Sequence, residues 1–181
     1  MVAGWLGWEL VGIVLIFFAG SALHFTFAWC GRAPIVAPFA PVNESVWEHL
    51  KMAFWPAVVY AAAEYLAFGH EVDGFLAAKS AGIVLMPICI VVLFYGYKAV
   101  LKGHRLWLDI LIFFIAVSAG QMGSYFLLTA GLLTGRHGWL GPAAVALLGA
   151  SFVAFTFKPP RLPIFRDSAT GAYGHRKPRP E

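Results

Sequence analysis

Long apolar stretches constrain this chain more than any other feature of its sequence. An α-helix of about 20 residues crosses the roughly 30 Å hydrocarbon core of a bilayer. Five stretches approach or exceed that length, over Trp8–Cys30, Val46–Phe68, Phe75–Leu101, Leu106–Leu133 and Trp139–Phe157. The sequence therefore predicts an all-α fold, a polytopic transmembrane bundle of five helices, whose main partner is the lipid bilayer.

The composition excludes a soluble globular domain. Hydrophobic residues make up 60% of the chain and charged residues 12%, with a mean hydropathy of +0.76, whereas soluble domains have about 45–50% and about 25%. A net charge of +4 would suit nucleic acid in a soluble protein. Here the basic residues flank apolar stretches, where they contact lipid headgroups, so we expect no nucleic-acid partner.

The distribution of basic residues predicts the topology. Residues 1–157 form the transmembrane domain and residues 158–181 a basic, proline-rich tail. Basic loops resist translocation and stay cytoplasmic. With five spans, Lys79 and Arg136 fall on one side, and the other 11 of the 13 basic residues fall on the opposite side: Arg32, Lys51, Lys98, Lys102, Arg105, Lys158, Arg161, Arg166, Arg176, Lys177 and Arg179. We therefore predict an external amino terminus and a cytoplasmic tail.

Small residues at four-residue spacing predict one helix contact, because they allow two backbones to approach closely in lipid. Such stripes occur in the fourth and fifth predicted helices, at Ala116, Gly120 and Ser124 and at Ala146, Ala150 and Ala154. The two stripes predict that these helices pack against each other.

A polar motif at the start of the second predicted helix is the main candidate for a functional site. It is PVNESVWEHLK, residues 41–51. His24 lies in the last third of the first predicted helix, and an antiparallel neighbour would bring it to the same depth. The candidate ligand-binding residues are His24, Asn43, Glu44, Ser45, Glu48, His49 and Lys51.

These residue types are compatible with several kinds of chemistry. Imidazole and carboxylate groups bind Zn²⁺ and similar ions, which makes His24, Glu48 and His49 candidate metal ligands. Glu48 is also the candidate catalytic residue, as a general base, and a haem held by the two histidines is a further geometric alternative. No motif identifies a cofactor, and Cys30 and Cys89 lack the paired spacing of a thiolate zinc site.

The same motif also has a purely structural interpretation. Ser45 and Glu48 fit a capping box, in which the serine hydroxyl and the glutamate each accept a free backbone N–H. Asn43 is an alternative cap, and Lys51 can extend its ammonium group toward the interface. His49 has no part in either cap.

A second polar set is predicted toward the outer half of the bundle, comprising Glu9, Glu64, Gln121, Ser124 and Tyr125. An ionised carboxylate in hydrocarbon is costly, so we expect Glu64 to face the bundle interior or a hydrated cavity. Connected with the polar motif, this set would form a proton or cation path. The alternative is ordinary hydration at the interface.

Two segments carry a family resemblance: PVNESVWEHLKMAFWP at Pro41–Pro56 and FKPPRLPIFRDSATGAYG at Phe157–Gly174. They resemble signatures of a family of small bacterial polytopic membrane proteins known as a domain of unknown function. The resemblance implies the fold, a bacterial origin and an ordered tail segment, but no activity. The chain is also similar, more distantly, to the tryptophan-rich sensory and translocator proteins, although its loop lacks their Trp-Pro-Pro pattern.

The sequence thus supports three functional hypotheses for a multi-pass protein of the bacterial inner membrane. The first is a polar pocket at the cytoplasmic leaflet that binds or moves a small polar or ionic ligand. The second is a metal-dependent membrane enzyme that acts on a lipid or isoprenoid head group. The third is an accessory subunit that docks a membrane-protein partner or a second copy of the chain.

Overall fold

The computed structural model describes residues 2–101, 105–135 and 138–175. Within these residues the fold is all-α, as predicted. It has five long helices, α1 (Val2–Trp29), α2 (Val46–Ala67), α3 (Phe75–Leu101), α4 (Leu106–Thr129) and α5 (Leu140–Phe157), and two short 3₁₀ turns, η1 (Gly69–Glu71) and η2 (Pro163–Phe165). Strand-like pairing in the described residues is limited to one bridge, between Arg166 and Tyr173. The first helix begins at Val2 rather than at the predicted Trp8.

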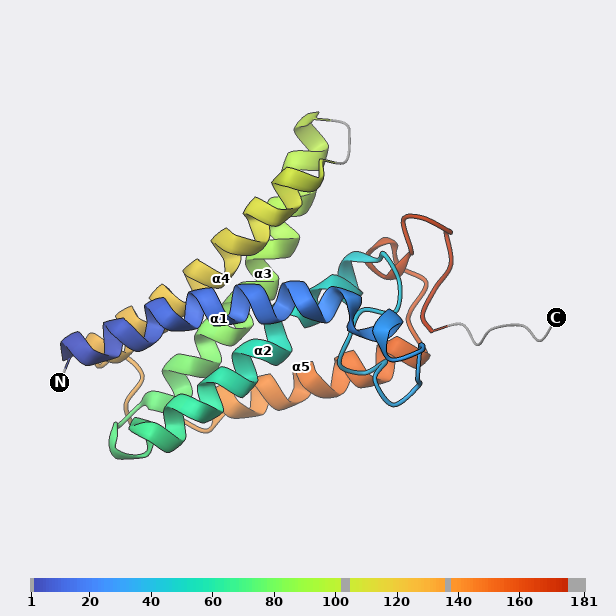
Figure 1. Ribbon diagram of the computed structural model, residues 1–181. Coiled ribbons are helices and arrows are strands. Elements are labelled where there is room, and N and C mark those ends of the chain that lie inside the picture. The colour runs from blue at the N-terminus through green and yellow to red at the C-terminus, as the bar shows by residue number, and fades with distance from the viewer. Residues whose placement is uncertain (1, 102–104, 136–137, 176–181) are drawn as a thin grey trace.

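The helices form one bundle with two distinct ends (Figure 1). The amino terminus, the α2–α3 connection and the α4–α5 connection lie at one end, which we call the amino-terminal end. The α1–α2 loop and the tail lie at the other, which we call the tail end (Figure 1). Helix α1 packs on α2 and α4, while α3 packs on α2, α4 and α5. The connections on either side of α2 and of α5 thus lie at opposite ends, as the five-span prediction requires.

The polarity of the bundle is the reverse of that of a soluble protein. Large apolar side chains point outward, such as Phe18 at 65% and Leu147 at 71% exposure, whereas charged side chains on the helices are buried, among them Glu48, Lys51 and Lys79. Outward apolar surface of this extent would be unstable in water but suits lipid. The helices therefore have the character of a multi-pass membrane protein.

Among the described residues, four helices, α1, α3, α4 and α5, are long and apolar enough to cross a membrane. Helix α2 differs because it carries Glu48, Lys51 and Glu64, which are all buried inside the bundle. Its 22 residues span about 33 Å at 1.5 Å per residue, enough for the hydrocarbon core. Helix α2 thus has the length of a span, with its charged side chains shielded from lipid by the other helices.

Burial also changes the interpretation of two basic residues. Lys51 and Lys79 were counted with the loop charges in the topology prediction, but both are buried in ion pairs inside the bundle. Of the remaining basic residues, Lys102, Arg136, Arg176, Lys177 and Arg179 lie outside the described residues. The predicted orientation therefore depends on the loop and tail charges without Lys51 and Lys79.

The small-residue stripe of α4 packs against α3 rather than against α5. A Cβ atom added at Gly82 of α3 would lie 2.4 Å from the carbonyl oxygen of Gly120 in α4, so the two backbones touch at this point. Helix α5 packs instead on α3 and α2. The predicted contact between the fourth and fifth helices was therefore wrong, because the spacing of small residues shows which face is close-packed but not which helix it meets.

This close contact gives a prediction for Gly82→Ala. The added methyl group meets backbone, which cannot move aside as a side chain can, so we expect a loss of about 1–3 kcal/mol in the free energy of unfolding. Gly96→Ala on the same helix is the control, since nothing lies within 4 Å of its added Cβ. Thermal unfolding in detergent micelles measures both, and equal stability of the two variants would contradict the packing described here.

Candidate functional site

The polar motif forms the N-terminal turn of α2 and the loop before it. Ser45 is the N-cap, and its hydroxyl oxygen accepts the Glu48 N–H at 3.4 Å. The reciprocal half of a capping box does not form, because the Ser45 N–H donates to Asn43 Oδ1 at 2.9 Å, and Glu48 Oε2 accepts the Val42 N–H at 3.0 Å. Asn43 and Ser45 thus share the capping role, and Glu48 is directed elsewhere.

The tail holds this loop in place. Asn43 Nδ2 donates to the Gly174 carbonyl at 3.3 Å, and the Ser168 hydroxyl donates to the Glu44 carbonyl at 3.0 Å. Gly174 has φ +64°, and a Cβ there would lie 2.9 Å from the Thr156 carbonyl oxygen, so the tail can cross the end of α5 only with glycine here. The Phe165 ring of η2 packs against the Trp47 ring of α2 in a tilted arrangement, with 4.8 Å between ring centroids. The tail as far as His175 is therefore an ordered part of the tail end.

Lys51 and Glu48 form a buried ion pair beneath this loop. Lys51 is 0% exposed, and its Nζ donates to Glu48 Oε2 at 2.6 Å, Thr156 Oγ1 at 2.5 Å and the Ala37 carbonyl at 2.9 Å. All three ammonium protons therefore have acceptors, from α2, α5 and the α1–α2 loop. This network joins three segments, and it leaves neither charge facing an open site.

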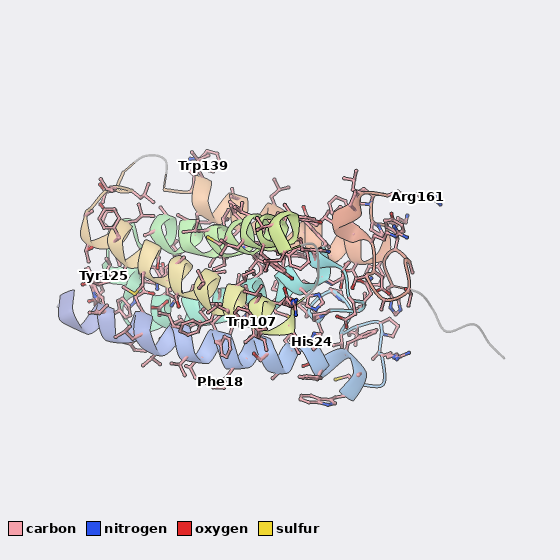
Figure 2. All side chains as sticks on the ribbon, turned by 90° about the horizontal axis from the view of Figure 1, so that it is seen from above. Phe18, His24, Trp107, Tyr125, Trp139 and Arg161 are labelled. Atoms are coloured by element: carbon pink, nitrogen blue, oxygen red, sulfur yellow. The ribbon has the colours of Figure 1, made fainter. Side chains whose placement is uncertain are left out.

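A separate cluster of His24, Glu44 and His49 lies beside it. One ligand atom from each of these three residues lies within 4.8 Å of the others. Among the described residues, these three form the group of His, Cys, Asp or Glu side chains that lie close enough together to hold a metal ion. The two imidazole rings are 5.2 Å apart between centroids, and His24 Nδ1 is buried without a hydrogen-bond partner among the described residues. His24 lies on the part of α1 nearer the tail end, far from Tyr125 (Figure 2).

The orientation of His49 is fixed by the helix turn on which it stands. Its Nδ1 lies 2.9 Å from the Ser45 carbonyl oxygen, which can only accept, so Nδ1 carries a proton. Its Nε2 then points to Glu44 Oε2 at 3.3 Å. The hydrogen bond from His49 lowers the pKa of the Glu44 carboxyl group, with a smaller opposing effect of burial. Glu44 is thus held as a carboxylate beside two imidazole rings.

One known protein family matches this chain over nearly its whole length. A family model described as a family of unknown function, DUF6512, matches residues 3–175. The chain belongs to this family. The membership predicted from the two sequence segments is therefore confirmed, and the matched region of the DUF6512 chain includes all five helices and the ordered tail. No curated protein and no solved structure matches the chain.

The DUF6512 structure divides the predicted site residues into three groups. His24, Glu44 and His49 form the cluster of possible metal ligands. Glu48 and Lys51 pair with each other, so the carboxylate beside the histidines comes from Glu44 rather than from Glu48. Asn43 and Ser45 cap α2. Two open depressions on the described surface are lined by other residues. One lies around Lys98 and the tail, and the other around η1 and the α4–α5 connection.

The second polar set gathers at the amino-terminal end, where it includes a residue that sequence reasoning missed. Lys79 Nζ lies 2.6 Å from Glu9 Oε1 and 2.7 Å from Glu64. The topology prediction counts Lys79 as a loop charge, although an ionisable residue inside an apolar span is itself a sign of a special role. Thr156, which accepts from Lys51, was also missed, and no sequence signal distinguishes it from other helix threonines.

Proposed function

We propose that this DUF6512 protein binds a divalent metal ion of the Zn²⁺ type through His24, Glu44 and His49. The observation that carries the proposal is the convergence of two imidazole rings and one carboxylate within 4.8 Å, where one ring nitrogen, His24 Nδ1, is buried and unpaired among the described residues. A buried unpaired nitrogen is costly unless a ligand binds it. Metal binding at His24 Nδ1 would remove that cost.

The spacing supports tetrahedral coordination after a small adjustment. Bonds of about 2.0–2.2 Å place two tetrahedral ligand atoms roughly 3.3–3.6 Å apart, and His49 Nε2 and Glu44 Oε2 are already 3.3 Å apart. The remaining separation can close because Glu44 has 52% of its side chain exposed and can move. The Nδ1–H of His49 donates to a backbone carbonyl, which is the usual outer-shell support of a metal-binding histidine.

Two histidines and one glutamate leave one coordination position open. Catalytic zinc sites have three protein ligands and a water molecule in the fourth position, whereas structural sites are closed by four. The ligand number therefore also favours the second hypothesis, an enzyme acting on a lipid head group, over a purely structural ion. Both oxygens of Glu48 are already hydrogen bonded, so we do not include Glu48 as the base of that reaction.

The proposed site lies at the tail end, which the topology prediction assigns to the cytoplasmic side. The topology prediction still places ten basic residues on the cytoplasmic side when the buried Lys51 is left out of the count. We propose accordingly that the ion is bound at the cytoplasmic leaflet of a bacterial inner membrane.

The test separates the two carboxylates of the motif. We expect Glu44→Gln to weaken Zn²⁺ binding by at least the 10–100-fold that loss of an outer-shell partner costs, because the amide lacks the charge. Glu48→Gln should leave the affinity unchanged and lower the unfolding temperature, because it leaves the buried Lys51 without its carboxylate. Calorimetric titration of the full chain in detergent, below the unfolding temperature, measures both. A greater loss of affinity in Glu48→Gln would contradict the proposal.

A further inference from the structure

At the amino-terminal end, three charged side chains from three helices meet inside the bundle. Lys79 Nζ of α3 donates to Glu9 Oε1 of α1 at 2.6 Å and to Glu64 Oε1 of α2 at 2.7 Å. Helix α4 adds the Ser124 hydroxyl, 3.2 Å from Glu9 Oε1. We call Glu9, Glu64 and Lys79 the carboxylate–lysine triad. It is separate from the proposed metal site, which lies at the opposite end.

The triad has one more acidic group than basic groups. Glu9, Glu64 and Lys79 are 2%, 0% and 3% exposed, so water does not screen them. If both carboxyl groups were ionised, the triad would carry a net negative charge, which is strongly unfavourable in the interior of a membrane bundle. The excess charge therefore requires a cation in addition to Lys79.

The hydrogen bonding around the triad is also incomplete. Glu9 Oε2 and Glu64 Oε2 are buried without hydrogen-bond partners among the described residues, although Glu64 Oε2 is near Lys79. The side-chain nitrogen of Gln121, Nε2, is also buried and unpaired among these residues. Gln121 is 4% exposed, and its Nε2 lies beside Gly12, one turn after Glu9, where an added Cβ would be 2.2 Å away. The Gln121 donor and the Glu9 Oε2 acceptor thus lack hydrogen-bond partners among the described residues, whereas Glu64 Oε2 has the Lys79 ammonium group 2.7 Å away.

We propose that the triad binds one exchangeable proton, shared between Glu9 and Glu64. A new O–H bond forms at the free oxygen of one carboxylate with a proton taken from water, and it breaks again when the proton returns to water, so no redox partner is needed. The proton neutralises the excess charge and supplies a donor. A metal cation fits less well, because Lys79 already occupies the space between the carboxylates and would repel it.

The surrounding titratable groups do not supply the missing charge. Tyr60 of α2 uses its hydroxyl to donate to the Trp8 carbonyl at 2.6 Å. His70 and Glu71 of η1 are 51% and 80% exposed in their side chains and contact each other at 3.8 Å. From helix α4, the described contact of the triad is the neutral Ser124 hydroxyl, and the neutral Gln121 amide lies beside Gly12. The site would thus change between net charge zero and minus one as its proton binds and leaves.

Infrared difference spectroscopy of the full chain in phosphatidylcholine vesicles tests this proposal, because a protonated carboxyl group has a C=O stretch that a carboxylate lacks. We expect a buried protonated-carboxyl band at neutral pH that disappears on alkaline titration. Glu9→Gln and Glu64→Gln should each abolish it, since the remaining carboxylate pairs with Lys79. Lys79→Gln should roughly double its area, because two carboxyl groups then lack a cation.

Glu71→Gln is the matched control, as an exposed glutamate at the same end, and it should leave the band unchanged. The proposal is overturned if the wild-type chain shows no such band at neutral pH, or if the band persists in both glutamine variants. It is also overturned if adding Na⁺ at constant pH removes the band, since a metal cation would then be the ligand. The wild-type titration decides the question even where a variant fails to fold.

Discussion

Lys51→Met should lower the free energy of unfolding by about 3–5 kcal/mol, the usual cost of removing one partner from a buried ion pair. The substitution leaves the Glu48 carboxylate buried without its cation and removes the donor that binds Thr156 and the Ala37 carbonyl. Methionine fills a similar volume, so lost packing adds little. Chemical and thermal unfolding in detergent micelles measures the effect.

The double variant Glu48→Gln with Lys51→Met is the control for this interpretation. It removes both charges, while glutamine can still accept the Val42 N–H that Glu48 accepts now. We expect it to be more stable than Lys51→Met alone, because replacing both members of a buried pair avoids an uncompensated charge. A double variant no more stable than the single one would show that the charge of Glu48 is not what Lys51 compensates.

His49→Ala should reduce Zn²⁺ affinity by at least 100-fold, because it removes one of the three proposed ligands. Loss of a ligand should cost more affinity than the 10–100-fold lost with an outer-shell partner. Helix α2 should remain folded, since its cap uses Ser45 and Asn43 and not the imidazole. Calorimetric titration of the purified chain measures the affinity.

His70→Ala is the matched control, because His70 is an exposed histidine of η1. The α2–α3 connection, which contains η1, lies at the other end of the bundle (Figure 1). Its removal should leave zinc affinity unchanged. An equal loss in His49→Ala and His70→Ala would indicate adventitious binding by surface histidines, and no loss in either would remove His49 from the site.

Much of the fold could be predicted because its signals are local. Apolar stretches of membrane-spanning length and glycine- or proline-containing connections mark the helices without reference to any partner. Ser45 is the helix cap for the same reason, as a serine at the start of an apolar segment. The order of the helices and the approximate bounds of α2, α3 and α5 follow directly.

The pairing of charged residues could not be predicted in the same way, since it depends on contacts between helices. Four-residue spacing would place Glu44 and Glu48 on one stripe of a helix, but the chain before Ser45 is not helical. Glu44 therefore turns toward His49 and His24, while Glu48 faces Lys51. Lys79 meets Glu9 across 70 residues of sequence, and such a pair becomes visible only when α1 and α3 are placed in space.

The central claim, a metal ion held by His24, Glu44 and His49, is tested most directly by X-ray absorption at the zinc edge of the zinc-loaded full chain. We expect a shell of nitrogen and oxygen atoms only, at roughly 2.0–2.2 Å, with imidazole scattering from two rings that falls to one ring in His24→Ala. A sulfur atom at about 2.3 Å, as from the exposed Cys30, or a spectrum unchanged in His24→Ala, would contradict the proposed site.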